Sequence, residues 1–222
     1  MTTHFIAAME RILWLYSLPY DPTYPVICFD ERPCFLIGDR IDPIEMKKGE
    51  VKKEHYAYEK NGSCALLAAI EPLTGTRIAE VRQRRTKKEF TELCQKIVKT
   101  YPEAKQIRVV LDNLNTHTKG AFYDHLPADE AWALSQCLEF FYTPKSASWL
   151  NMIEIEFSAL SRLSLKKRIP TIDELEKTVQ TFFRKRMEQK VRINWMFKID
   201  DCREKLHSKY AMINEANKKF AN

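Results

Sequence analysis

The sequence lacks the cysteine spacings that mark two common kinds of site. Its six cysteines, at positions 28, 34, 64, 94, 137 and 202, include no Cys-x-x-Cys pair. This scatter excludes a zinc ribbon and a thioredoxin-type redox motif, because both need closely spaced pairs of cysteines. Several of the cysteines lie inside apolar runs, so we expect free buried thiols in a reducing compartment.

The sequence also lacks targeting and membrane segments. The stretch Met1–Ile6 has no basic region, long apolar core or small-residue cleavage site, and no apolar run approaches the length of a membrane span. Internal repeats and low-complexity tracts are absent too. We therefore expect a soluble, cytoplasmic and nucleoid-associated protein with no membrane partner.

What the sequence does contain is an ordinary apolar content and a moderate basic excess. Of its 222 residues, 45% are hydrophobic and 30% are charged, and the net charge is +6. This length favours one core with additional helices over two equal domains. The basic excess fits a polyanionic partner, and it fits equally a solvated surface of no special purpose.

Two apolar runs rich in β-branched residues stop abruptly at an acid. Val109–Leu111 precedes Asp112 and a polar loop, and Val26–Phe29 precedes Asp30 and Glu31. We predict two strands that each end at their aspartate and present the two carboxylates side by side. Glu31 should point to the opposite face of its pleated strand, as a surface acid or as a group that supports the site from behind.

Periodicity, proline and capping residues predict the other elements. We expect helices over residues 5–17, from Thr86 to 102, over 128–136, from a cap at 146–148 to about 166, from Thr171 onward and from about 200, and strands over 63–70, 77–82, 107–111 and 138–143. Residues 38–62 are basic and aperiodic, which indicates a long loop. The first three strands should pair antiparallel, whereas the crossover through the Thr86 helix should make the next pairing parallel.

A third acid lies on the helix expected after residue 148. Glu154 and Glu156 are two positions apart, so on a helix their side chains point roughly 200° apart and only one of them can face the two aspartates. Glu156 falls within the apolar stripe, whereas Glu154 falls on its flank near Asn151 and Ser158. We select Glu154, and Glu156 is left without a role.

Three acids on separate elements suggest a metal site. Hard divalent cations prefer oxygen ligands, and Asp30, Asp112 and Glu154 could together hold two Mg²⁺ ions, with Mn²⁺ as a substitute. Such a pair polarises a phosphate and activates the attacking oxygen, so phosphodiester chemistry is the expected use. The alternative is that Asp30 only starts a turn and Asp112 only caps the following loop.

Four segments occur in a fixed order along the chain: Cys28–Glu31, Arg84–Lys88, Leu111–His117 and Ser148–Glu154. Together they resemble the catalytic domain of DDE-class insertion-sequence transposases of the mariner-like superfamily, and the resemblance runs from about residue 5 past residue 192. It implies an α/β ribonuclease H-like fold with a mixed five-stranded sheet flanked by helices. We expect a lead-in helix over 1–20, the catalytic domain over 21–195 and a helical extension over 196–222.

The resemblance also implies roles for individual residues. Asp30 would be the first acid and bridge both ions, Asp112 would be the second acid and Glu154 the third. The supporting residues around them would be Asn113, His117 and Asn151. His117 matches an Asp-Asn-x-x-x-His pattern of the family, although a purely structural loop histidine remains open. At position 156 the family usually carries an apolar or aromatic residue, so this chain departs from the pattern there.

Basic residues and one tryptophan are the candidate DNA contacts. They are Lys47, Lys48, Lys52, Lys53, Arg82, Arg84, Arg85, Lys87, Lys88 and Trp149. The basic side chains could contact phosphates without reading bases, or they could simply be solvated. Trp149 could stack on a flipped or terminal base, or it could anchor the core.

The resemblance implies metal-dependent DNA strand cleavage and strand transfer during the insertion of a mobile element. The partners would be double-stranded DNA, as transposon ends and a TA target, and further copies of the chain in a homodimer or larger synaptic complex. Members of the family usually carry helix-turn-helix domains ahead of this region. One alternative is therefore a non-catalytic DNA-binding or oligomerising remnant without its end-recognition domain, and another is a structure-directed nuclease of the same fold.

Overall fold

The computed structural model describes residues 1–40 and 57–221. Its strands are β1 (Val26–Asp39), β2 (Tyr58–Ile70), β3 (Arg77–Arg82), β4 (Ile107–Leu111) and β5 (Leu138–Tyr142). Its α-helices are α1 (Thr3–Ser17), α2 (Lys87–Thr100), α3 (Gly120–Tyr123), α4 (Ala128–Cys137), α5 (Ile153–Leu163), α6 (Ile172–Glu188), α7 (Ile199–Lys205) and α8 (His207–Ile213). Two 3₁₀ helices, η1 (Ser148–Leu150) and η2 (Glu215–Phe220), complete the described elements.

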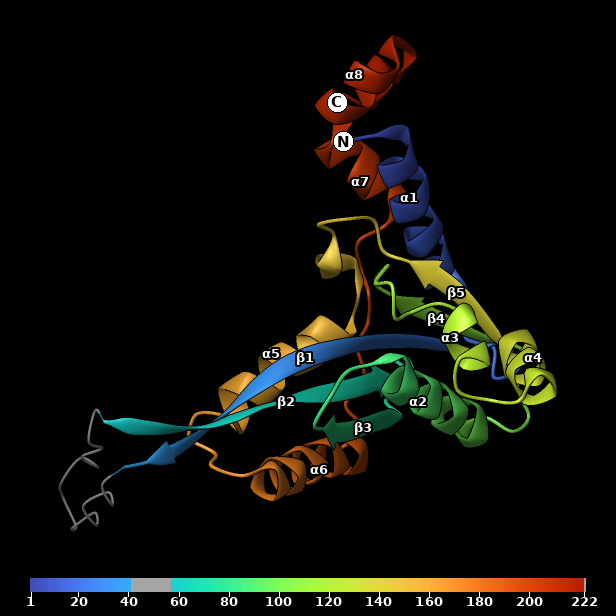
Figure 1. Ribbon diagram of the computed structural model, residues 1–222. Helices are drawn as coiled ribbons and strands as arrows, with labels where there is room; N and C mark the ends of the chain where they lie inside the picture. The colour runs from blue at the N-terminus through green and yellow to red at the C-terminus, as the bar shows by residue number, and fades with distance from the viewer. Residues whose placement is uncertain (41–56, 222) are drawn as a thin grey trace.

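The five strands form one mixed sheet in the order β3-β2-β1-β4-β5 (Figure 1). β1 pairs antiparallel with β2, and β2 pairs antiparallel with β3. β4 pairs parallel with both β1 and β5. The predicted order of three antiparallel strands followed by parallel pairings is confirmed, since the α2 crossover returns the chain to the same end of the sheet.

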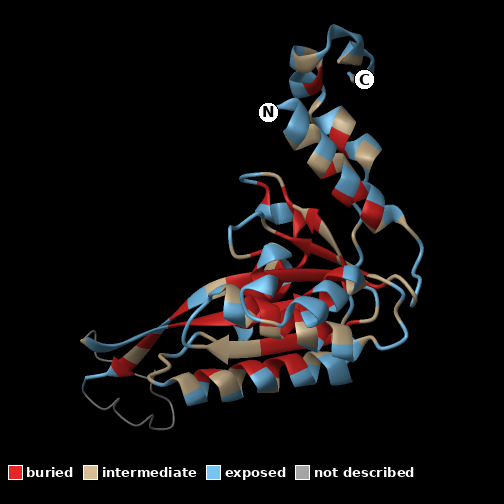
Figure 2. Cartoon of the chain, turned by 45° about the vertical axis from the view of Figure 1, so that its right-hand side comes forward, coloured by how far each residue is buried: buried red, intermediate tan, exposed pale blue. Residues whose placement is uncertain are grey.

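Side chains alternate between the two faces of the sheet, and each face has its own core. Figure 2 shows buried residues along the strands and exposed residues on the outer sides of the helices. On one face, Cys28 and Val110 pack with buried residues of α1, α5 and α6. On the other face, Phe29 and Leu111 pack with buried residues of α2, α3 and α4. Helices on both faces explain why the central strands are continuous apolar runs rather than alternating ones.

The two ends of the chain pack against each other at one pole of the molecule (Figure 1). Arg203 of α7 donates to Glu10 of α1 at 2.9 Å, and the Tyr210 hydroxyl of α8 donates to the same carboxylate at 2.7 Å. Met9 and Ile12 on α1 are buried in the core that also contains Cys28 and Val110 of the sheet. The proposed domain boundaries at residues 20 and 195 stay a prediction, and α1 shares its core with the sheet.

Two sequence-based boundaries are wrong at the β1–β2 hairpin. β1 does not end at Asp30 but continues to Asp39, and β2 begins at Tyr58 instead of at residue 63. The two strands pair from Cys28 with Ile70 out to Asp39 with Tyr58. Backbone hydrogen bonds hold this extension whatever the polarity of its side chains, so residues 38, 39 and 58–62 of the predicted loop belong to strands. Residues 41–56 of that prediction lie outside the described residues.

The predicted caps are partly confirmed. Thr86 and Glu89 form the expected capping box of α2, and Thr171 accepts from the Glu174 amide at 3.2 Å at the start of α6. Residues 146–148 do not cap the next helix, because η1 intervenes and α5 begins only at Ile153. Among the described residues, no helix combines the length and the apolar character needed to cross a membrane.

Candidate active site

Asp30 and Asp112 lie on neighbouring strands. Cys28 of β1 is paired with Val110 of β4, and each aspartate lies two residues further along the chain, on the side of the sheet that carries α1, α5 and α6. Asp112 directly follows the end of β4, whereas Asp30 lies in the middle of β1, opposite Ala68 of β2. The predicted neighbourhood of the two acids is present, although only one of them ends a strand.

Asp30 is buried among negative charge. Its side chain is held by the Glu31 amide, which donates to its carboxylate at 2.7 Å. Burial, with smaller contributions from the charges of Asp112 and Glu154, raises the pKa of Asp30 to about 7, although the Glu31 amide and His117 act in the opposite direction. The structure therefore brings the three sequence-predicted acids into one electrostatic neighbourhood.

Glu154 reaches this neighbourhood from the first turn of α5. Its side chain is half-buried and makes no hydrogen bond or ion pair within residues 1–40 and 57–221. Asn151, just before the helix, is buried and donates to the Phe29 carbonyl at 2.7 Å and to Asp30 at 3.5 Å. This amide ties the start of α5 to β1 beside the first acid, which is the supporting position expected for Asn151.

His117 connects Asp112 to Glu31. Its Nδ1 lies 2.5 Å from an Asp112 carboxylate oxygen, and its Nε2 lies 3.2 Å from Glu31 Oε1. The ring is fully buried against Phe29 and Phe90, with centroids 5.1 and 4.8 Å away. Burial lowers the pKa of His117, but the two carboxylates outweigh it and raise the pKa to about 9.

Glu31 is therefore no surface acid. It lies on the opposite sheet face from Asp30, as predicted, but it is buried and acts on Asp112 through the imidazole of His117. A carboxylate on each side of the ring fixes its orientation. Sequence reasoning missed the link because Glu31 and His117 are 86 residues apart.

The donor chemistry of the three acids suits a hard cation. Asp30, Asp112 and Glu154 offer carboxylate oxygens, the ligands that Mg²⁺ and Mn²⁺ prefer. The mutual repulsion that contributes to the raised pKa of Asp30 is the kind that a bound cation relieves. In the part of the chain that is described, no three Asp, Glu, His or Cys side chains converge closely enough to hold one ion together.

The candidate DNA contacts divide into paired and unpaired groups. Arg82 pairs with Glu80 at 2.7 Å and with Glu92 at 3.3 Å, and Lys87 pairs with Asp124 at 2.7 Å. Lys88 lies 4.0 Å from Glu92.

Arg84 and Arg85 are exposed and form no ion pair with any described residue. Asn113, predicted as a supporting residue of the acids, is exposed as well. Four further candidates, Lys47, Lys48, Lys52 and Lys53, lie outside the described residues.

Trp149 is not a core anchor. Its side chain is 45% exposed, and its ring stacks on Trp195 at a centroid distance of 6.4 Å with Phe197 at its edge. The segment after α6 thus supports the tryptophan from one side. An exposed aromatic near the start of α5 keeps the base-stacking interpretation open.

Glu156 has the partners that the sequence did not reveal. Its side chain is fully buried and receives both Arg77 of β3 and Arg186 of α6. Burial raises the pKa of Glu156, but the two arginines outweigh it and hold the pKa below its usual value. The arginines lie 79 and 30 residues away, so no local pattern could have indicated them.

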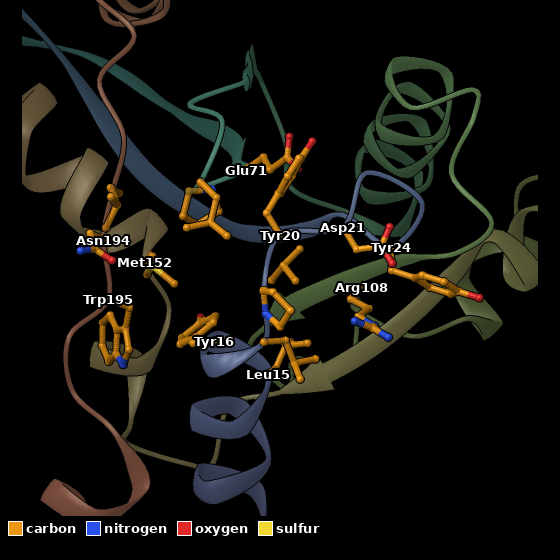
Figure 3. Close-up of a pocket in the computed structure, with 16 residues that line it drawn as sticks. Leu15, Tyr16, Tyr20, Asp21, Tyr24, Glu71, Arg108, Met152, Asn194 and Trp195 are labelled. Carbon is orange, nitrogen blue, oxygen red and sulfur yellow. The ribbon is translucent and has the colours of Figure 1, made fainter.

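Three hollows lie near this region, and two of them are lined by one of the three acids. The first is a groove beside Asp112 and Asn113, whose other walls are the N-terminal end of α1 and the loop from Thr143 to Ser148. The second is a more enclosed cavity lined by Tyr16, Tyr20, Arg108, Met152 and Trp195, among others (Figure 3). None of the three acids lines this second cavity. The third hollow is lined by Glu31 and Glu154, with Phe157 and Ser158 of α5 beside them. The groove and this third hollow are therefore the two that adjoin the acids.

The sequence also matches a known family over most of the region that builds this site. The model of the DDE superfamily endonucleases matches residues 25–176, which include all three acids. The chain belongs to this family. No curated protein matches the chain.

Solved structures of the Mos1 mariner transposase share the fold of this DDE endonuclease domain. The Mos1 paired-end complex with Mn matches with a TM-score of 0.57 at 12% identity, over 86% of this chain and 59% of that one. The Mos1 strand transfer complex matches at 0.55 and 12%, over 83% and 56%. A pre-cleavage Mos1 transpososome matches at 0.54 and 11%, over 87% and 62%.

These matches confirm the ribonuclease H-like fold with its mixed five-stranded sheet. The chain spans less than two thirds of the Mos1 chains that it matches. The family membership expected from the four sequence segments is confirmed at the level of the DDE superfamily.

Proposed function

We propose that this chain is the catalytic domain of a transposase, which cleaves a DNA strand and joins the freed 3′ end to a target strand. The observation that supports this most directly is that Asp112, after β4, and Glu154, on α5, both act electrostatically on the buried Asp30 of β1, and together with burial they raise its pKa. Charges of one sign held close together in a fold are typical of a functional site.

Each residue has a defined part in this proposal. Asp30, Asp112 and Glu154 would hold two Mg²⁺ ions, which supply polarisation of the phosphate and an activated attacking oxygen when bound. His117, held by Glu31, keeps the Asp112 carboxylate in one orientation. Asn151 holds the start of α5 against β1. Arg84, Arg85 and Trp149 would contact the DNA strand.

The partners follow from the same proposal. The Mos1 structures are described as a paired-end complex, a strand transfer complex and a transpososome. By analogy, this chain would bind double-stranded transposon ends and target DNA as a homodimer or larger synaptic complex. The Mn in one of those structures makes Mn²⁺ a suitable probe for this chain.

The test has a binding stage and a cleavage stage. Calorimetry with Mn²⁺ should give measurable binding to the native chain, and Asp112→Asn should abolish or strongly weaken it. DNA that carries the element's terminal repeats should be nicked with Mg²⁺ or Mn²⁺ by the native chain, and not by Asp30→Asn or Asp112→Asn. Unchanged Mn²⁺ binding in Asp112→Asn would place the metal elsewhere.

The third acid is tested separately. Glu154→Gln should abolish cleavage if Glu154 completes the catalytic set. A native chain that never nicks DNA, even when an upstream DNA-binding domain is added as a separate polypeptide, would contradict the proposal. It would favour the non-catalytic remnant, which retains DNA binding or self-association without the reaction.

A further inference from the structure

The buried carboxylate of Glu156 is held by two arginines from different elements. Arg77 Nε donates to Glu156 Oε2 at 3.1 Å, and Arg77 Nη2 donates to Oε1 at 2.9 Å. Arg186 Nε and Nη2 donate to the same two oxygens, each at 2.7 Å. Both oxygens therefore receive one bond from each guanidinium, and this geometry is bidentate on both sides.

Arg77 extends the network to the neighbouring backbone. Its remaining donors reach the Gly75 carbonyl at 2.6 Å and the Val191 carbonyl at 2.9 Å. Gly75 has a φ of 83°, and a Cβ built on it would lie 2.6 Å from the Val191 carbonyl oxygen. Glycine is thus required where the β2–β3 turn meets the segment after α6. One guanidinium joins this turn, the segment after α6 and α5.

Among the apolar side chains that α5 buries, Glu156 supplies a polar contact, formed with Arg77 and Arg186. Ile153, Phe157 and Leu160 on α5 are buried around Glu156 and pack towards the sheet. Apolar contacts are not directional, so they permit small rotations of a helix about its axis. Four charge-assisted hydrogen bonds are directional, and buried ion pairs contribute more to specificity than to stability where they fix a register.

The rotation of α5 decides where Glu154 points. Glu154 and Glu156 are roughly 200° apart around the helix, so fixing Glu156 towards β3 and α6 turns Glu154 to the opposite side. That side is where Glu154 influences Asp30. Figure 1 shows α5 and α6 following different parts of the same sheet, which the two arginines connect through Glu156.

We propose that Arg77, Glu156 and Arg186 are positioning residues that hold α5 in the rotation that keeps Glu154 near Asp30. The catalytic consequence of this proposal rests on the proposed function, whereas the hold on α5 does not. No other role for Glu156 is needed, because its oxygens are fully occupied by arginine donors.

A variant that removes the bonds without leaving a buried charge gives the sharpest test. The triple variant Arg77→Met, Glu156→Leu, Arg186→Met replaces all three partners with apolar side chains of similar length, an exchange that is often neutral for stability. Glu156→Gln alone keeps the shape but leaves the arginines without their counter-charge. Glu154→Gln is the matched control, because it alters the same helix outside the cluster.

The first readout needs no metal. Hydrogen exchange followed by mass spectrometry should show faster exchange over residues 153–163 in the triple variant, by about tenfold, and unchanged exchange over α2. Glu154→Gln should exchange over residues 153–163 as the native chain does. Native exchange over 153–163 in a folded triple variant would overturn the proposal, because α5 would then be held without the cluster.

The second readout connects the helix to Glu154. In the triple variant, the Kd for Mn²⁺ measured by calorimetry should rise about tenfold at an unchanged midpoint of thermal unfolding, similar to Glu154→Gln. A folded triple variant with native Mn²⁺ affinity would overturn the positioning of Glu154. If the native chain binds no Mn²⁺, the proposed function fails, and the exchange of α5 alone decides whether the cluster holds the helix. If the triple variant does not fold, the same two readouts on Glu156→Gln decide.

Discussion

Glu154 and Glu156 are two residues apart on α5, yet their surroundings are opposite. Glu156 is fully buried, and two arginines saturate both of its oxygens. The side chain of Glu154 is half-buried, makes no hydrogen bond or ion pair with any described residue and adds to the negative charge around Asp30. Glu156 thus stabilises the fold through its ion pairs, whereas the charge of Glu154 repels that of Asp30.

The same contrast divides the other charged residues. Arg82 is paired with two glutamates, whereas the neighbouring Arg84 and Arg85 are unpaired among the described residues. A charge whose partners lie within the chain is satisfied without a ligand. A charge that lacks such partners, or that repels its neighbours, is available for a metal ion or a phosphate. Pairing therefore separates Glu156 and Arg82, which have partners within the chain, from Glu154, Arg84 and Arg85, whose side chains have no ion-pair partner among the described residues.

The largest expected effect comes from removing the paired acid. Glu156→Ala leaves Arg77 buried without its counter-charge, and it should lower the free energy of unfolding by about 3 to 5 kcal/mol. Glu154→Ala should change it by less than about 0.5 kcal/mol, since no bond is lost. Urea unfolding of the two variants measures the difference. Equal losses would remove the contrast between the two acids.

The second effect concerns a repelled acid. Because burial and nearby acids raise the pKa of Asp30 to about 7 from 3.8, the folded state binds its proton more tightly than the unfolded state. Stability therefore falls as pH rises from about 4 to 7. Asp30→Asn should remove this loss and stabilise the chain at pH 8 by about 2 to 4 kcal/mol, with little effect at pH 4.

Thermal unfolding in EDTA at the two pH values measures this prediction. Asp129→Asn, at an exposed position on α4, is the matched control and should shift the midpoint equally little at both. A gain in Asp30→Asn that is the same at pH 4 and pH 8 would show that ionisation of Asp30 is not its source.

A smaller effect is expected at the His117 bridge. Its two carboxylates raise the pKa of His117 to about 9, so the stabilisation from the charged ring is complete below about 6.5 and is lost as pH rises through 9. Glu31→Gln should therefore cost about 1 to 2 kcal/mol at pH 6 and much less at pH 10. NMR titration should show the pKa of His117 falling in this variant.

The matched control is Glu130→Gln, which replaces an exposed glutamate outside the site. It should leave the His117 titration as in the native chain. A native titration in Glu31→Gln would mean that Asp112 alone holds the ring charged.

The smallest effect on stability, and the one specific to DNA, is expected at the unpaired arginines. Arg84→Ala and Arg85→Ala should each change stability by less than about 0.5 kcal/mol and should lower the slope of log affinity against log salt by about 1. Arg82→Ala should lower stability slightly and leave that slope unchanged, because its charge is already paired. Fluorescence anisotropy with a labelled duplex at several salt concentrations distinguishes them.

The sequence predicted the sheet and its acids because their signals are local. Apolar runs that meet an acid placed Asp30 and Asp112 on neighbouring strands, and helical phase selected Glu154 over Glu156. The capping box at Thr86 located the start of α2. Each of these inferences uses residues within a few positions of each other, where propensity and periodicity act directly.

The sequence could not predict the partners of these residues, since those lie far away in the chain. The links from Glu156 to Arg77 and from Glu31 to His117 span 79 and 86 residues. The extension of β1 past Asp30 depends on pairing with β2, which overrides the polar character of the hairpin. The sequence therefore indicates where the charged side chains lie along each strand and helix, but only the tertiary structure shows which of them pair.

The docking of α7 and α8 onto α1 brings the two ends of the chain close enough for energy transfer between attached dyes. The contacts of Glu10 with Arg203 and Tyr210 hold the two ends of the chain at one pole, far apart in sequence but close in space. A donor and an acceptor dye placed at residues 2 and 221 should therefore transfer energy efficiently while these helices stay docked. Loss of that transfer at a lower temperature than the loss of sheet signal would show that this pole melts as a separate unit.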